Sequence, residues 1–148
     1  HMTVVIASGV FDLLHYGHIR FLEEAKRVGG PESRLVVIVA RDETVLRLKG
    51  RRPVIPEDQR RALVEALKVV DEALLGYEDM NLEAVIEKIK PDIIAVGYDQ
   101  EEIEREVKRI IDERGLNLRV ERIGRFGSEE LNSSSKIKRR IVEDWRSL

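Results

Sequence analysis

Apolar runs recur along the chain at intervals that fit alternating strands and helices. Runs rich in β-branched residues predict five strands, at residues 3–7, 35–40, 72–75, 92–96 and 118–123. The runs at 35–40 and 92–96 are apolar at successive positions, which is typical of strands covered on both faces of a parallel sheet.

Between these runs, apolar residues repeat with helical spacing and predict helices over residues 18–28, 57–67, 82–89 and 101–114. Pro56 suits the start of the second helix and Gly115 the end of the fourth. Strand–helix alternation with right-handed crossovers predicts the α/β class, as a single Rossmann-like doubly wound parallel sheet of five strands with flanking helices. We expect one domain over residues 3–148, with residues 1–2 as a tag remnant.

Ligands of such sheets bind at the carboxyl ends of the strands, near the point where the strand order reverses. Four segments follow predicted strands and are expected to converge there, namely residues 9–18, 41–42, 97–100 and 123–135. The sequence therefore predicts one crevice built from four loops.

The composition and charge of the chain exclude several classes of site and partner. The chain of 148 residues has no cysteine, which excludes disulfides, thiolate catalysis and thiolate metal sites. Its net charge of −2 gives no reason to expect a nucleic-acid partner, although residues 48–53 and 135–140 form basic clusters. No run approaches the roughly 20 apolar residues that cross a bilayer, so we expect a cytoplasmic protein without a membrane partner.

The segment Gly9–His18, GVFDLLHYGH, carries the clearest candidate chemistry. It contains neither a dinucleotide-binding nor a P-loop fingerprint. His18 lies at a predicted helix start, where free N–H groups favour an anion, and Gly17 permits close backbone approach. His15 and His18 could donate hydrogen bonds to phosphate oxygens as charge develops. From the residues alone, two surface histidines are an equal alternative, whereas a zinc pair lacks further ligands.

The full string resembles the signature G-[TS]-F-D-x-x-H-x-G-H of the nucleotidyltransferase superfamily that includes cytidylyltransferases and small adenylyltransferases, and it departs only at Val10. The resemblance implies transfer of a nucleotidyl group with release of pyrophosphate. A divalent cation such as Mg²⁺ would accompany the ATP, with Asp12 a weak candidate for placing it. His15 and His18 would be catalytic, and the nucleotide would be bound by Gly9, Val10, Phe11, Asp12, His15, Gly17 and His18.

A second string, NSSSKIKRRI at residues 132–141, resembles the C-terminal I-S-S-T-x-I-R element of the family. The resemblance places Ser133, Ser134 and Ser135 at the hydroxyl positions that hold nucleotide phosphates, with Lys138 at the basic one. Capping of the last helix is the alternative for the serines. Further along, Ile137, Ile141 and Trp145 are spaced four residues apart, which predicts that this helix packs one apolar face against the body.

The resemblance also assigns residues in the remaining loops. Lys49, in the basic stretch 41–61, would reach the transferring phosphate and bind substrate, with Arg52 as a helper. Arg60, on the following helix, would bind substrate. A solvated basic loop is the alternative for Lys49, Arg47 and Arg51. Near the fourth strand and the C-terminal loop, the expected contacts are Gly97 and Asp99 for nucleotide, Tyr98 for substrate, and Arg125 as a catalytic cation.

The acceptor rests on resemblance alone. Residues 4–100 look most like the archaeal FAD synthases, which adenylylate FMN with ATP. The alternatives are a cytidylyltransferase acting with CTP on glycerol 3-phosphate or a related polyol phosphate, and a non-catalytic nucleotide-binding domain. Superfamily relatives often dimerise, so a homodimer is an alternative to a monomer. A flavin ring needs an apolar slot, for which the candidates are Leu13, Leu14, Tyr16, Tyr98 and Phe126.

Overall fold

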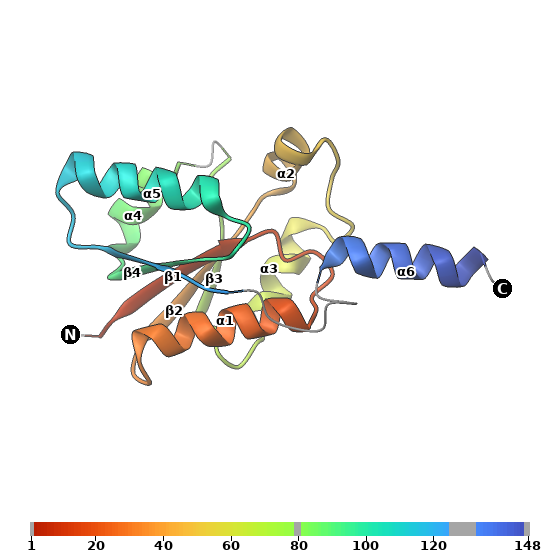
Figure 1. Cartoon of the computed structure of the whole chain (residues 1–148), viewed down its shortest axis with the longest axis horizontal. Coiled ribbons are helices and arrows are strands. Elements are labelled where there is room, and N and C mark those ends of the chain that lie inside the picture. The colour runs from red at the N-terminus through yellow and green to blue at the C-terminus, as the bar shows by residue number, and fades with distance from the viewer. Residues whose placement is uncertain (1, 79–80, 125–132, 147–148) are drawn as a thin grey trace.

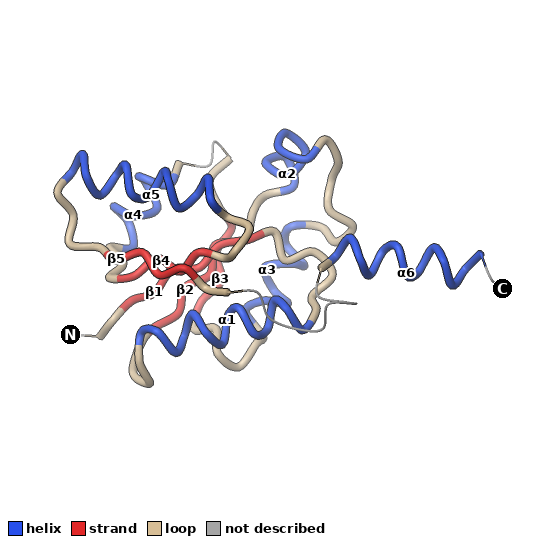
Figure 2. Tube along the Cα trace, in the orientation of Figure 1, coloured by secondary structure: helices blue, strands red, loops and turns tan. Residues whose placement is uncertain are grey.

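The computed structural model describes residues 2–78, 81–124 and 133–146, and its centre is a parallel sheet (Figure 2). Its strands run in the order β3-β2-β1-β4-β5. Their bounds are β1 Val4–Gly9, β2 Arg34–Val39, β3 Glu72–Leu75, β4 Ile93–Val96 and β5 Arg119–Arg122. Every neighbouring pair is parallel, so the predicted α/β class and doubly wound sheet are confirmed.

Four helices cover the two faces of the sheet (Figure 1). Helices α1 (Tyr16–Gly29) and α3 (Glu57–Glu65) pack on one face, and α4 (Leu82–Ile89) and α5 (Glu101–Arg114) on the other. Successive residues of β1 serve opposite cores: Val5 packs with Leu22 of α1, and Ile6 packs with Val107 of α5. The order of strands reverses between β1 and β4, which places the expected ligand site at their carboxyl ends.

The stretch that we expected to be a loop after β2 contains a helix, α2 (Asp42–Lys49). Its start is joined to the start of α3: the Asp42 amide donates to Glu57 Oε1 at 2.8 Å, and the Glu57 amide donates to Asp42 Oδ2 at 3.4 Å. Gly50 ends α2 with a φ of 77°, a conformation that favours glycine. Residues 50–56, which we call the basic link, therefore form a short connection between two helices that cap each other.

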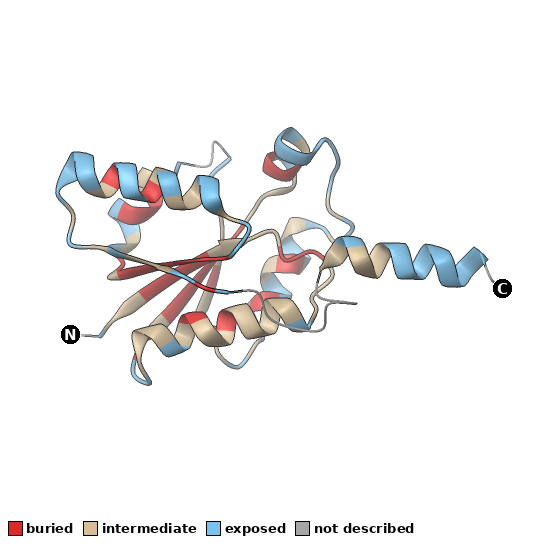
Figure 3. Ribbon diagram, viewed as in Figure 1, coloured by how far each residue is buried: buried red, intermediate tan, exposed pale blue. Residues whose placement is uncertain are grey.

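The last helix, α6 (Ser134–Arg146), extends away from the body and has no buried residue among those described (Figures 1 and 3). Ile141 is 59% exposed and Trp145 is 75% exposed. The prediction that the Ile–Trp face packs on the body is therefore wrong, because helical periodicity identifies an apolar face without identifying what covers it.

None of the helices in the described part of the chain is long and apolar enough to cross a membrane.

Candidate active site

The signature segment begins with a tight loop that Gly9 makes possible. A Cβ on Gly9 would lie 2.9 Å from Cε2 of Phe11, so a side chain there would displace the Phe11 ring. Phe11 is buried and holds a left-handed φ of 55°, and its ring meets that of His18 edge-on at 5.3 Å. Gly9 and Phe11 thus support the His18 ring, which is how these two residues serve the site in the structure.

His15 and His18 lie together at the start of α1, with their rings stacked and the ring centroids 3.7 Å apart. The backbone amide of His15 donates to Nδ1 of His18 at 3.3 Å. Because Nδ1 accepts this bond, the proton of a neutral His18 is carried by Nε2, where it can be donated to a ligand. Nδ1 of His15 is buried against the first turn of α1, where the His15 and His18 side chains form a capping box.

Both imidazoles are neutral near pH 7 in the unliganded protein. Burial and the neighbouring His15 together lower the pKa of His18 to about 3, although the Asp12 carboxylate offsets part of their effect. Burial also lowers the pKa of His15. The pair therefore offers neutral N–H donors in a partly desolvated place, which suits stabilisation of charge that develops on a bound phosphate.

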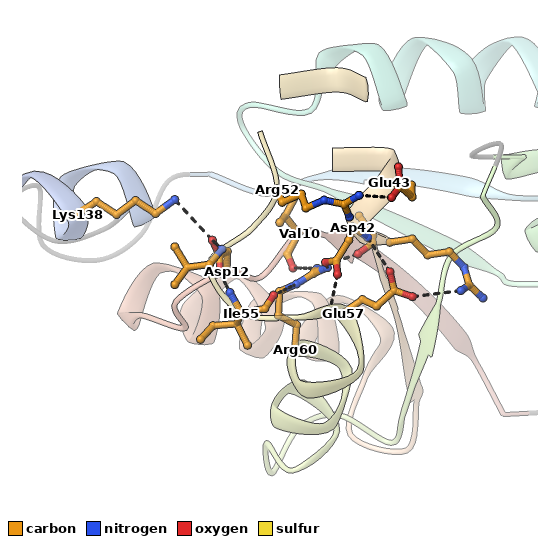
Figure 4. Close-up of polar contacts among 12 residues, drawn as sticks. Val10, Asp12, Asp42, Glu43, Arg52, Ile55, Glu57, Arg60 and Lys138 are labelled. Atoms are coloured by element: carbon orange, nitrogen blue, oxygen red, sulfur yellow. Dashed lines mark hydrogen bonds and ion pairs between the residues drawn. The ribbon is translucent and has the colours of Figure 1, made fainter. Parts of the chain in front are cut away.

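Asp12 joins three segments of the site (Figure 4). Its carboxylate accepts from the amides of Val54 at 2.9 Å and Ile55 at 3.0 Å, and it faces Lys138 Nζ of α6 at 3.6 Å. Its carbonyl accepts from the Ser134 hydroxyl. Burial alone would raise the pKa of Asp12, but the two amides and Lys138 outweigh burial and lower this pKa below its usual value. Asp12 is thus ionised and holds the basic link and α6 against the signature loop.

The expected role of Asp12 as a metal ligand does not fit this geometry. Each carboxylate oxygen already accepts a backbone N–H, and Lys138 Nζ lies 3.6 Å from Oδ2, so a cation there would meet a positive charge. Within the described ranges, no three His, Asp or Glu side chains are grouped so that they could hold a metal ion. These residues therefore do not fit a protein-bound cation.

An open cleft of about 400 Å³ lies between the basic link and the start of α6. We call it the basic cleft; its lining residues are Arg51, Arg52, Val54, Ser135 and Lys138. Arg52 pairs with Glu43, whereas Arg51 has no ion pair with any residue that the structure describes. Arg51, for which a solvated loop was the alternative, thus lines this cleft beside Arg52. The cleft suits phosphate groups.

The three serines, which we expected to share one role, have separate ones. Ser133 Oγ accepts from the Lys136 amide at 3.2 Å and so caps α6, as the alternative interpretation allowed. The Ser134 hydroxyl donates to Asp12, and Ser135 lines the basic cleft. Ser135 is thus the serine that opens onto the basic cleft, in the first turn of α6.

Arg60 does not face the crevice, which corrects its expected role in binding substrate. Its side chain is fully buried, and its guanidinium donates to carbonyls of Ile55, Val10 and Ala40 at 2.7–2.8 Å and to Asp42 Oδ1 at 2.6 Å (Figure 4). Val10 contributes its carbonyl to this set. Arg60 is a positioning residue, because four of its five N–H donors are already used within the protein.

Lys49, the other residue assigned from the basic stretch, ends α2 and is exposed, and it is not one of the residues that line the basic cleft.

The carboxyl end of β4 lies beside that of β1, which leads into the signature segment. Tyr98 and Asp99 are exposed there, and a Cβ on Gly97 would lie 3.2 Å from Asp99 Oδ1. Gln100, which the sequence did not single out, accepts from the Gly97 amide at 2.8 Å and donates to the Ser8 carbonyl at 2.9 Å. It bridges β1 and β4 at the switch point. Arg125 and Phe126 lie outside the described residues.

A stacked pair of neutral imidazoles at one helix start and a basic cleft at another suit chemistry on a phosphate group. A family profile described as cytidylyltransferase-like matches residues 6–140. The chain belongs to this cytidylyltransferase-like family.

The curated relatives agree with this placement. An FAD synthase of Methanopyrus kandleri is 46% identical over 96% of this chain and 93% of its own length. An FAD synthase of Ferroglobus placidus is 50% identical over 95% of this chain and 89% of its own length. The resemblance to archaeal FAD synthases noted in residues 4–100 thus extends over nearly the whole chain.

Solved structures confirm the fold. A protein of Thermoplasma volcanium, described as a lipopolysaccharide core biosynthesis protein, has a TM-score of 0.77 and 42% identity over 86% of this chain and its own full length. A protein of unknown function from Archaeoglobus fulgidus has a TM-score of 0.64 with 19% identity over 82% of this chain and 89% of its own, and supports the fold alone.

Proposed function

We propose that this nucleotidyltransferase transfers AMP from ATP to FMN and produces FAD and pyrophosphate. The relatives named FAD synthase, at 45–50% identity over nearly the whole chain, carry the choice of FMN. The geometry supports the transfer chemistry, and its central observation is the stacked pair of neutral histidines beside the basic cleft.

The reaction requires no covalent enzyme intermediate. An oxygen of the FMN phosphate attacks the α-phosphorus of ATP, the bond from that phosphorus to the bridging oxygen breaks, and pyrophosphate leaves with the bond electrons. Because the FMN phosphate is already ionised at neutral pH, no general base is needed. Catalysis then consists of positioning the reactants and stabilising charge.

In this proposal the residues at the starts of α1 and α6 bind different phosphate groups. The imidazoles of His15 and His18 donate to oxygens of the α-phosphate as negative charge builds there. Ser135, Arg51 and Lys138 hold phosphate oxygens in the basic cleft. Lys49 and Arg125 are proposed as further cations, with Tyr98 and Asp99 as contacts for substrate and nucleotide.

A divalent cation is proposed to enter with ATP, as part of the substrate. When bound, it neutralises part of the triphosphate charge, and the triphosphate rather than this chain's described acids would hold it. A cytoplasmic location, a homodimer and the absence of nucleic-acid and membrane partners stay predictions.

The test is product analysis by mass spectrometry. Purified protein with ATP, FMN and Mg²⁺ should give FAD and pyrophosphate, whereas riboflavin should give no product because it lacks the nucleophilic phosphate. The competing reaction is CTP with glycerol 3-phosphate under the same conditions. Faster turnover of that pair would overturn FMN as the acceptor, and nucleotide binding without any pyrophosphate release would overturn the activity.

A further inference from the structure

Gln100 lies where the two central strands of the sheet separate. The pairing of β1 with β4 ends at Ala7 and Ala95, whereas the pairing of β1 with β2 continues beyond this point. Ser8 and Gly97 follow the last β1–β4 pair, and the Gln100 side chain joins them. Its Nε2 donates to the Ser8 carbonyl at 2.9 Å, and its Oε1 accepts from the Gly97 amide at 2.8 Å.

The backbone of Gln100 is bonded as well. Its N–H donates to the Gly97 carbonyl at 3.1 Å and closes the turn of residues 97–100. Its carbonyl accepts from the Glu104 amide at 3.0 Å, and Gln100 is the residue just before α5. A single residue therefore joins the end of β1, the turn after β4 and the start of α5.

The turn after β4 is packed closely around Gly97, which is buried. A Cβ on Gly97 would lie 3.2 Å from Asp99 Oδ1 and 3.5 Å from Gln100 Oε1. It would also lie 3.7 Å from Cε1 of Phe21, which belongs to α1. Because close-packed groups transmit displacements, a change in the Gln100 side chain would move this turn.

The two segments that Gln100 joins carry different parts of the candidate site. Ser8 immediately precedes the signature segment, which carries His15 and His18. The turn after β4 carries the residues proposed to contact nucleotide and substrate. Their relative position therefore sets where a bound nucleotide lies with respect to the imidazoles. Rates of group transfer depend steeply on such placement, and an error of about 1 Å can cost about 10²-fold.

We propose that Gln100 is a positioning residue for nucleotidyl transfer. By bridging the end of β1 to the turn after β4, it holds the bound nucleotide at the correct distance from His15 and His18. Gln100 does not act on the reacting phosphorus itself, and its effect on the rate passes through the placement of the α-phosphate against the two imidazoles. The inference rests on the proposed function, because ATP and FMN are taken as the substrates.

Two variants and a control separate the bridge from the turn. Gln100→Glu has nearly the same shape and keeps an oxygen for the Gly97 amide, but it has no N–H for the Ser8 carbonyl. Gln100→Met has a similar length and loses both bonds. Gln59→Glu makes the same exchange at an exposed position of α3, outside the candidate site.

Both Gln100 variants should lower kcat about tenfold or more. KM for ATP and for FMN should change by less than about threefold, because the groups proposed to hold the substrates are still present. Gln59→Glu should match wild type, and thermal unfolding should show that every variant is folded at the assay temperature. A raised KM for ATP with kcat unchanged would mean that Gln100 only supports nucleotide binding, and it would overturn the inference.

A double-mutant cycle tests whether Gln100 acts through the histidines. In a His18→Ala background, correct placement of the α-phosphate against that imidazole no longer helps. Adding Gln100→Met should therefore lower kcat only about two- to threefold further, since His15 is still present. A full tenfold loss in that background would show that Gln100 acts independently of His18, which contradicts the proposed role.

Failure of this inference can be told apart from failure of the proposed function. If wild type makes FAD and Gln100→Met has the same kcat, the inference alone is wrong. If wild type makes no FAD but turns over CTP with glycerol 3-phosphate, FMN is not the acceptor. The same loss of kcat in the Gln100 variants with that pair would still support the positioning role, and an unchanged kcat would overturn it.

Discussion

Helices α1 and α6 both begin beside Asp12, but α1 buries Leu22 and Ala25 in the core, whereas α6 buries no described residue. The N-terminus of α1 carries the two histidines, and that of α6 carries the serines and Lys138. The difference indicates a division of work. The groups proposed to act on the reacting phosphorus are fixed by the core, and the groups proposed to hold the rest of the substrates lie on a helix joined to the body through polar contacts to Asp12.

The largest expected effect is on catalysis at α1. Replacement of either His18 or His15 by alanine should lower kcat about 10²-fold or more, the usual loss for one donor to a developing negative charge. Circular dichroism should show that both variants remain folded. Arg27→Ala, an exposed change in the last turn of the same helix, should match wild type in steady-state assays. Turnover near the wild-type rate in either histidine variant would refute the proposed role.

Truncation of an apolar side chain should cost much more stability on α1 than on α6. Leu22→Ala removes a fully buried side chain and should lower the free energy of unfolding by about 2–5 kcal/mol. Ile141→Ala on α6 should change that free energy by less than about 0.5 kcal/mol. Urea denaturation of both variants measures the difference. Equal losses would mean that α6 is packed in solution.

The pH dependence of stability should report on the buried histidines of α1. Because burial lowers the pKa of His18 to about 3 from its ordinary 6.5, the unfolded chain gains a proton on acidification that the folded protein does not. His18 therefore destabilises the fold progressively as pH falls from 6.5 toward about 3, by up to about 1.4 kcal/mol per pH unit.

Thermal unfolding followed between about pH 4.5 and 6.5, above the range in which Asp12 titrates, tests this expectation. Tm should fall less steeply with acidification in His18→Ala than in wild type. An identical slope in the two proteins would show that His18 is protonated normally in the folded state.

The smallest effects should distinguish neighbouring serines at the start of α6. Ser133→Ala removes a helix cap and should cost about 1 kcal/mol of stability with KM for ATP unchanged. Ser135→Ala should raise KM for ATP and leave the stability unchanged, because its hydroxyl lines the basic cleft. Calorimetry beside kinetics checks both, and a raised KM in Ser133→Ala would return that serine to the phosphate site.

Sequence periodicity predicted the sheet well because parallel strands are apolar at successive positions and their helices have long apolar faces. β3, α4 and α5 have the bounds that the pattern predicted, at residues 72–75, 82–89 and 101–114. Helix α2 was missed since it is short, and it is held by the mutual capping of Asp42 and Glu57, which are 15 residues apart. A contact of that kind leaves no periodic signal.

The candidate site was predicted in part. The signature identified His15 and His18, whose pairing the structure shows. It did not reveal that Gln100 bridges two strands or that Arg51 lines the basic cleft, because both facts depend on residues far apart in the sequence. The amphipathic face of α6 was recognised, but its exposure depends on what lies opposite, which a single sequence pattern does not contain.

The buried Arg60 has a consequence for how variants of this enzyme are interpreted. Its guanidinium holds the carbonyls of Val10 and Ala40, the residues that follow β1 and β2, and so sets the width of the sheet at the edge where substrates enter. A lysine carries the same charge, but it lacks the planar guanidinium whose N–H groups point at several acceptors. Even Arg60→Lys would therefore loosen the contact between the ends of β1 and β2. Loss of activity in an Arg60 variant would therefore indicate a deformed site. It would not show that Arg60 binds a substrate phosphate directly.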